Sequence, residues 1–173
     1  MDSPTEPCDR AATHMRTEIL EQPAALRATI GALLPRSAEV AALADQARQV
    51  LFFARGTSDN AAVYGTYLIQ TRTGRLASLG SPSVATAYRS RIDLSGVLAI
   101  GLSQSGRTQE IVETLHWARD CGAAVVGITN EAGSPLAEMA DVARGGFTRC
   151  VSHGDAGARV VHGVARNGCR GLL

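Results

Sequence analysis

The chain has 173 residues, of which 45% are hydrophobic, and its formal net charge is +1. This length and apolar content predict one globular domain with a substantial core. A net charge so close to zero provides no overall field that would attract nucleic acid or an anionic membrane, so we expect neither partner and look for local anion recognition. No apolar run approaches the roughly 20 residues that a bilayer-spanning helix needs.

All 17 basic residues are arginine. The chain therefore has no lysine for a Schiff base or for a Walker A phosphate loop. The cysteines, Cys8, Cys121, Cys150 and Cys169, are scattered and form no C-x-x-C pair. We interpret them as reduced thiols, expect no metal and no cofactor, and, because the N-terminus shows no apolar leader, expect a cytoplasmic protein.

Residues 1–14 contain prolines and acidic side chains and few apolar ones, which predicts a disordered lead. From Met15 the apolar spacing becomes helical, so we expect N-terminal helices over 15–48. Pro23 is predicted either to interrupt this segment or to begin a second helix.

Strand and helix patterns then alternate along the chain. Apolar runs typical of buried strands cover 50–54, 76–79, 97–102 and 123–129, and residues 142–143 begin a fifth. Helical patterns lie between them, over 61–69, 82–88, 111–118 and 135–140. This alternation predicts an α/β fold of three layers, α/β/α, with a flavodoxin-like parallel sheet of about five strands over 49–146. Residues 147–173 are rich in glycine and arginine and predict an irregular tail.

Two turns of small polar residues follow the first and third strands: Gly56-Thr57-Ser58 and Ser103-Gln104-Ser105-Gly106-Arg107-Thr108. Each precedes a helix, whose first N–H groups and partial positive charge favour a phosphate. In the strand order 2-1-3-4-5 these strands are neighbours, so both turns would face one ligand. The substrate-binding residues predicted here are Gly56, Thr57, Ser58, Ser103, Gln104, Ser105 and Thr108.

Within this set, hydroxyl groups are divided between two tasks. Ser103, Ser105 and Thr108 are expected to hold the phosphate, whereas Thr57, Ser58 and Gln104 are expected to bind sugar hydroxyls. Gly106 is expected to let the ligand approach the backbone.

Other interpretations remain open for these turns. Both are also compatible with ordinary helix N-caps, and Gly101-x-Ser103-x-Ser105 lacks the last glycine of a serine-hydrolase nucleophile elbow. Glu110 is the nearest carboxylate, and we expect it to point into solvent. No catalytic residue is assigned.

Taken together, several motifs resemble the SIS (sugar isomerase) domain family. They are Gly56-Thr57-Ser58, Ser103-Gln104-Ser105-Gly106-x-Thr108, Glu18-Ile19-x-Glu21-Gln22-Pro23, Pro82-Ser83, Gly127-Ile128-Thr129-Asn130 and Ser134-Pro135-Leu136-Ala137. The likeness covers about residues 15–141, and within the family it is to the isomerase half of glucosamine-6-phosphate synthase and to related sugar-phosphate isomerases and deaminases.

The resemblance implies a five-stranded domain of amino-sugar metabolism that binds a phosphorylated sugar such as fructose 6-phosphate or glucosamine 6-phosphate. In the family, the general base, the ring-opening histidine and the lysines lie in a second SIS domain. After Asp141 the sequence departs from the family pattern, which predicts a single, truncated SIS domain that is incomplete for isomerase or aminotransferase catalysis by itself.

Three functional hypotheses therefore stay open: a sugar-phosphate isomerase or aminotransferase domain, a non-catalytic module that senses a sugar phosphate, and a non-functional fragment. Because SIS domains usually associate and a broken last strand would expose apolar surface, we also expect a homodimer.

Overall fold

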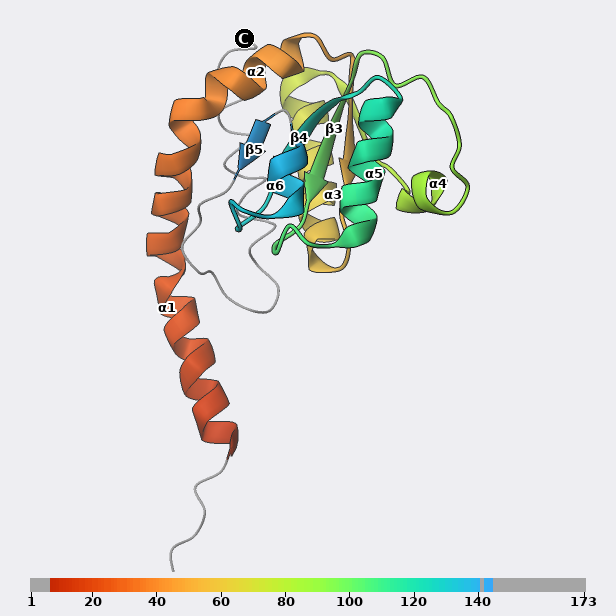
Figure 1. Cartoon of the computed structure of the whole chain (residues 1–173). Coiled ribbons are helices and arrows are strands. Elements are labelled where there is room, and N and C mark those ends of the chain that lie inside the picture. The colour runs from red at the N-terminus through yellow and green to blue at the C-terminus, as the bar shows by residue number, and fades with distance from the viewer. Residues whose placement is uncertain (1–6, 141, 145–173) are drawn as a thin grey trace, which may run out of the picture.

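The computed structural model of the chain describes residues 7–140 and 142–144, and Figure 1 shows the arrangement of its elements. The helices are α1 (Pro7–Leu33), the short 3-10 helix η1 (Leu34–Arg36), α2 (Ser37–Asp45), α3 (Thr57–Thr73), α4 (Pro82–Thr86), α5 (Gln109–Asp120) and α6 (Pro135–Met139). The strands are β1 (Gln49–Phe53), β2 (Leu76–Leu79), β3 (Val97–Leu102), β4 (Ala124–Ile128) and β5 (Val142–Arg144).

The five strands form one parallel sheet in the order β2-β1-β3-β4-β5. Phe53 at the end of β1 pairs with Gly101 of β3, which in turn pairs with Gly127 of β4. This strand order confirms the predicted flavodoxin-like α/β fold, because the first and third strands are neighbours at the centre.

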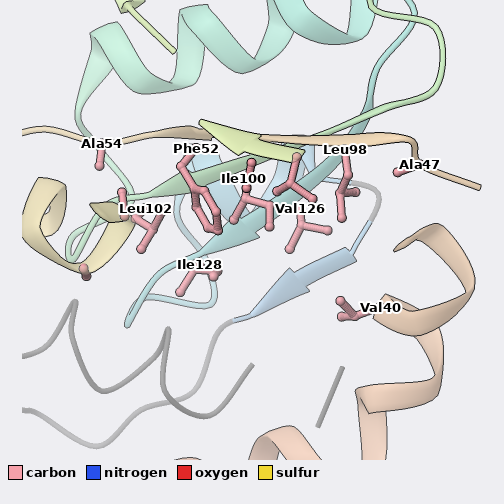
Figure 2. Packing of buried hydrophobic residues seen from close by; sticks show 13 residues of the cluster. Val40, Ala47, Phe52, Ala54, Leu98, Ile100, Leu102, Val126 and Ile128 are labelled. Atoms are coloured by element: carbon pink, nitrogen blue, oxygen red, sulfur yellow. The ribbon is translucent and has the colours of Figure 1, made fainter. Parts of the chain in front are cut away.

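Helices cover both faces of the sheet, which explains why its strands are apolar without alternation. On one face, Phe52, Ile100 and Val126 point to the side where Val40 of α2 lies (Figure 2), and α3 adds Ala61 and Ala62 to the same cluster. On the other face, α5 and α6 pack against the sheet. The buried side chains of that second cluster include Phe53, Ala99, Val125, Ile111, Leu115 and Leu136.

The N-terminal segment differs from the prediction. Helix α1 begins at Pro7, so the expected disordered lead is helical over 7–14, and the helix continues through Pro23 to Leu33. Proline removes one intrahelical hydrogen bond, and the helix-forming alanine and leucine residues on both sides of Pro23 sustain the remaining turns. In Figure 1, α1 extends well beyond the sheet. Residues 1–6 and the predicted tail 147–173 lie outside the described part of the chain.

Candidate functional site

The two predicted turns leave the sheet at the same edge. Phe53 is the last residue of β1 and Leu102 the last of β3, and the two strands run parallel and are hydrogen-bonded neighbours. The chain leaving β1 begins α3 at Thr57, and the chain leaving β3 begins α5 at Gln109. The starts of two helices therefore meet at the carboxyl ends of neighbouring strands, where ligands bind in open α/β sheets.

An ion pair joins these two turns directly. Arg55 Nε donates to Glu110 Oε2 over 2.7 Å, and Arg55 Nη2 donates to Glu110 Oε1 over 2.6 Å. The Arg55 guanidinium, mainly through this hydrogen bonding, holds the pKa of the Glu110 carboxyl below its ordinary value. Glu110 was expected to point into solvent; its side chain is 32% exposed, and its carboxylate is engaged by Arg55, a partner that was not predicted.

The loop before α5 is organised around a pair of hydroxyl groups. Ser103 is buried, and its Oγ lies 2.9 Å from Thr108 Oγ1, close enough for a hydrogen bond in either direction. Thr108 is the residue before α5, yet its side chain makes no capping bond to that helix. Ser105 is exposed, and its Oγ accepts a hydrogen bond from the Arg107 N–H at 3.3 Å.

This arrangement counts against the interpretation of the loop as an ordinary N-cap. At α6, Ser134 does cap its helix, since its Oγ accepts a hydrogen bond from the Ala137 N–H at 3.3 Å. Thr108 instead directs its hydroxyl to Ser103. The Thr108 side chain therefore does not cap the first turn of α5, and the Ile111 N–H donates instead to the Thr108 carbonyl at 3.0 Å.

Gly106 has a packing role that was not predicted. Its φ is +63°, and a Cβ at this position would overlap Ser134 Oγ and stand 2.6 Å from Thr129 Oγ1. The missing side chain therefore lets the loop press against the turn that follows β4, and the carbonyl of Gly106 accepts a hydrogen bond from the Leu136 N–H at 3.1 Å. Gly106 serves packing within the protein, because buried residues fill the space beside it.

The turn after β4 also holds the carbonyl of Gln104. The Asn130 N–H donates to it at 3.0 Å, and Thr129 Oγ1 donates to it at 3.3 Å. Thr129 and Ser134 are buried polar residues that support the loop from behind. In the sequence, both residues were named only as part of the family resemblance, and this supporting role was not predicted. The position of Thr129, directly after a buried strand, could have indicated it.

The start of α3 presents its polar groups more openly. Gly56 precedes the helix with φ +59°, Thr57 is exposed and Ser58 is half-buried. Within the described part of the chain, the hydroxyl groups of Thr57 and Ser58 have no hydrogen-bond partner, so both remain available to a ligand. The edge thus combines hydroxyl groups from two loops with one neutralised ion pair.

Comparison with known proteins assigns this architecture to a family. The family model for the SIS domain matches residues 43–144. The chain belongs to the SIS domain family. This match includes every predicted substrate-binding residue, and it begins before the predicted domain boundary at residue 49.

The similar proteins act on or bind phosphorylated sugars according to their names. The chain is 36% identical over 133 residues to the glutamine–fructose-6-phosphate aminotransferase of Aeropyrum pernix, covering 74% of this chain and 21% of that protein. The C-terminal domain of the Francisella tularensis glucosamine-fructose-6-phosphate aminotransferase superposes with a TM-score of 0.73 at 25% identity, over 92% of this chain and 48% of that one.

A second solved structure shares the fold. The Vibrio vulnificus NanR protein complexed with ManNAc-6P superposes with a TM-score of 0.74 at 23% identity, covering 98% of this chain and 63% of NanR. The chain spans about a fifth of the length of the aminotransferases it matches. It is therefore related to the isomerase domain of those enzymes, and their full activity does not follow from the match.

Proposed function

We propose that this SIS domain binds a phosphorylated sugar between the start of α3 and the start of α5. The observation that carries the proposal is that α3 and α5, whose starts bear hydroxyl groups and lack side-chain caps, begin at the carboxyl ends of the neighbouring strands β1 and β3. A dianionic phosphate gains hydrogen bonds and dipole attraction at such a position.

Chemical roles divide between the loops. In the loop before α5, the Ser105 hydroxyl accepts from the Arg107 N–H and keeps its own hydrogen to donate to a phosphate oxygen. The Ser103 and Thr108 pair shares one hydrogen, which leaves one further hydroxyl hydrogen for the ligand. On the other side, Thr57 and Ser58 offer hydroxyl groups that suit a polyol.

Two of the similar proteins carry a hexose 6-phosphate in their names, which supports this substrate class for the proposal. The relatives are aminotransferases of fructose 6-phosphate, and the fold-sharing NanR structure holds ManNAc-6P. We therefore infer that fructose 6-phosphate or an amino-sugar 6-phosphate is the natural ligand of the site, with Gly56, Thr57, Ser58, Ser103, Gln104, Ser105 and Thr108 as its contacts.

Calorimetric titration tests this proposal. Fructose 6-phosphate and glucosamine 6-phosphate are titrated into the full chain, with fructose and glucosamine as matched ligands that lack the phosphate. The proposal predicts binding of the phosphorylated sugars and none of their unphosphorylated forms. Equal binding of fructose and fructose 6-phosphate would show that phosphate is not recognised.

A sensing role without turnover is the second candidate. It is favoured because the carboxylate of Glu110, in the first turn of α5, is already engaged by Arg55 and is not free to act as a base. Incubation of the protein with fructose 6-phosphate and ammonia, or with glucosamine 6-phosphate, distinguishes the two roles. Product supports an enzyme, whereas ligand-induced thermal stabilisation without product supports a sensor.

Two further expectations accompany the proposal. None of the helices among the described residues is long and apolar enough to cross a membrane. The two expectations are a cytoplasmic location and a homodimer, and both are predictions. Fractionation of expressing cells tests the first, and light scattering of the purified chain tests the second.

A further inference from the structure

The Arg55–Glu110 ion pair connects the two loops of the proposed site across 55 positions of sequence. Arg55 directly precedes Gly56, and Glu110 lies in the first turn of α5, two residues after Thr108. Two parallel hydrogen bonds, of 2.7 and 2.6 Å, engage both carboxylate oxygens. Such a two-point contact fixes orientation as well as distance between the elements it joins.

A second arginine–glutamate pair in the chain provides a contrast. Arg36 and Glu39 are also exposed and are linked through both carboxylate oxygens, at 3.0 to 3.3 Å. They are three residues apart in sequence, so their pair spans only the junction of η1 with α2. The Arg55–Glu110 pair instead links two segments that follow different strands of the sheet.

The stability of the fold does not explain the geometry of this pair. The side chains of Arg55 and Glu110 are 56% and 32% exposed, and ion pairs in such surroundings contribute little to folding because water screens them. Both clusters of the core form without either residue. The effect of the pair to be explained is therefore on the relative placement of the two loops.

We propose that Arg55 and Glu110 are positioning residues that hold the two loops at the separation at which one phosphosugar contacts both. The inference rests on the phosphosugar function proposed above and adds a residue role to it. Neither side chain touches the ligand. Thr57 and Ser58 on one side, and Ser105 with Thr108 on the other, reach the ligand together only while the pair is closed.

A direct effect of the two charges on phosphate binding can be distinguished from an effect of the ion pair on the separation of the loops. Removing Arg55 alone leaves an extra negative charge beside the phosphate, and removing Glu110 alone leaves an extra positive one. A purely electrostatic role therefore predicts opposite effects for Arg55→Ala and Glu110→Ala. A double variant, Arg55→Ala with Glu110→Ala, preserves the net charge and removes only the connection between the loops.

The decisive experiment compares two ligands on the full chain by titration. Fructose 6-phosphate spans both loops, whereas inorganic phosphate needs only the loop before α5. For the double alanine variant we expect affinity for fructose 6-phosphate to fall about fivefold, as for the loss of one exposed two-point ion pair, with phosphate affinity unchanged. The control variant, Arg36→Ala with Glu39→Ala, makes the same change in composition and is expected to bind both ligands as the original chain does.

Each outcome bears on a different claim. If the original chain binds no phosphosugar, the proposed function fails and this inference fails with it. If the original chain binds and the double variant binds equally well, or if both ligands lose affinity by the same factor, the positioning role alone is overturned. The exchange of Arg55→Glu with Glu110→Arg rebuilds the pair, so recovered affinity for fructose 6-phosphate supports positioning and unrecovered affinity in a folded protein contradicts it.

Discussion

Ser134 Oγ occupies the space into which a side chain at Gly106 would project. The glycine has φ +63° and the serine is fully buried, so the loop before α5 and the start of α6 meet without room for a methyl group. This contact fixes the main chain of the proposed phosphate loop from within the protein.

Replacement of Gly106 by alanine tests that contact. Two effects add at this position, the left-handed backbone and the overlap with Ser134, and together they are expected to lower the free energy of unfolding by about 2 to 4 kcal/mol. Gly74→Ala is the matched control, because Gly74 has φ +67° and open space around it, and only about 1 kcal/mol is expected there. Urea denaturation of both variants gives the comparison. Equal losses would mean that the overlap at position 106 has no energetic effect.

The packing of α5 against the sheet predicts a second difference in stability. Leu115 is fully buried between α5 and the sheet, and Leu115→Ala is expected to lower the free energy of unfolding by about 2 to 5 kcal/mol through the cavity it leaves. Leu76 on the edge strand is 69% exposed, so Leu76→Ala should change stability little. Thermal denaturation followed by circular dichroism compares them. A stable Leu115→Ala protein would contradict the described core.

The hydroxyl groups of the loop before α5 should matter for the ligand more than for the fold. Ser105→Ala combined with Thr108→Val removes two donors and keeps the side-chain shape at position 108. Because each hydrogen bond to a charged group contributes about 1.5 to 3 kcal/mol, the loss of both should lower affinity for fructose 6-phosphate by at least ~100-fold. Thr71→Val is the control, since the Thr71 hydroxyl bonds only to carbonyls within α3. Unchanged affinity in the double variant would exclude these hydroxyl groups as contacts.

The ion pair predicts a lowered pKa for the carboxyl group of Glu110. Hydrogen bonding from Arg55 lowers the pKa of Glu110, so its carboxylate should persist to a lower pH than an ordinary glutamate. Since the pKa in the folded state lies below that in the unfolded state, the pair stabilises the folded protein above the ordinary glutamate pKa, and this contribution is lost as the pH falls through the lowered value. In the variant Arg55→Gln, the pKa of Glu110 should move back toward its ordinary value. Titration followed by carbon NMR measures this pKa in both proteins. An identical titration in both proteins would contradict the pairing.

Sequence patterns predicted the sheet because its signals are local and repeated. The run Val97–Leu102 is apolar on both faces, as a central parallel strand must be, and the turn signals that follow it mark the start of α5. The helix through Pro23 was mispredicted because the rule for proline describes one lost hydrogen bond, whereas the flanking turns decide whether a helix continues.

The support of the site was less visible in the sequence. Gly106 was interpreted as space for a ligand, but the neighbour that needs the space is Ser134, which is distant in sequence. The partner of Glu110 is equally distant, because Arg55 reaches it only once β1 and β3 pair. Contacts of this kind form only in the folded protein, so the spacing of residues within one segment of the sequence does not predict them.

A crystal structure of the full chain with fructose 6-phosphate tests the central claim most directly. The account predicts the phosphate at the start of α5, within hydrogen-bonding distance of the hydroxyl groups of Ser105 and Thr108, and the sugar hydroxyls against Thr57 and Ser58. A ligand bound at any other place on the domain, with the two loops empty, would contradict it.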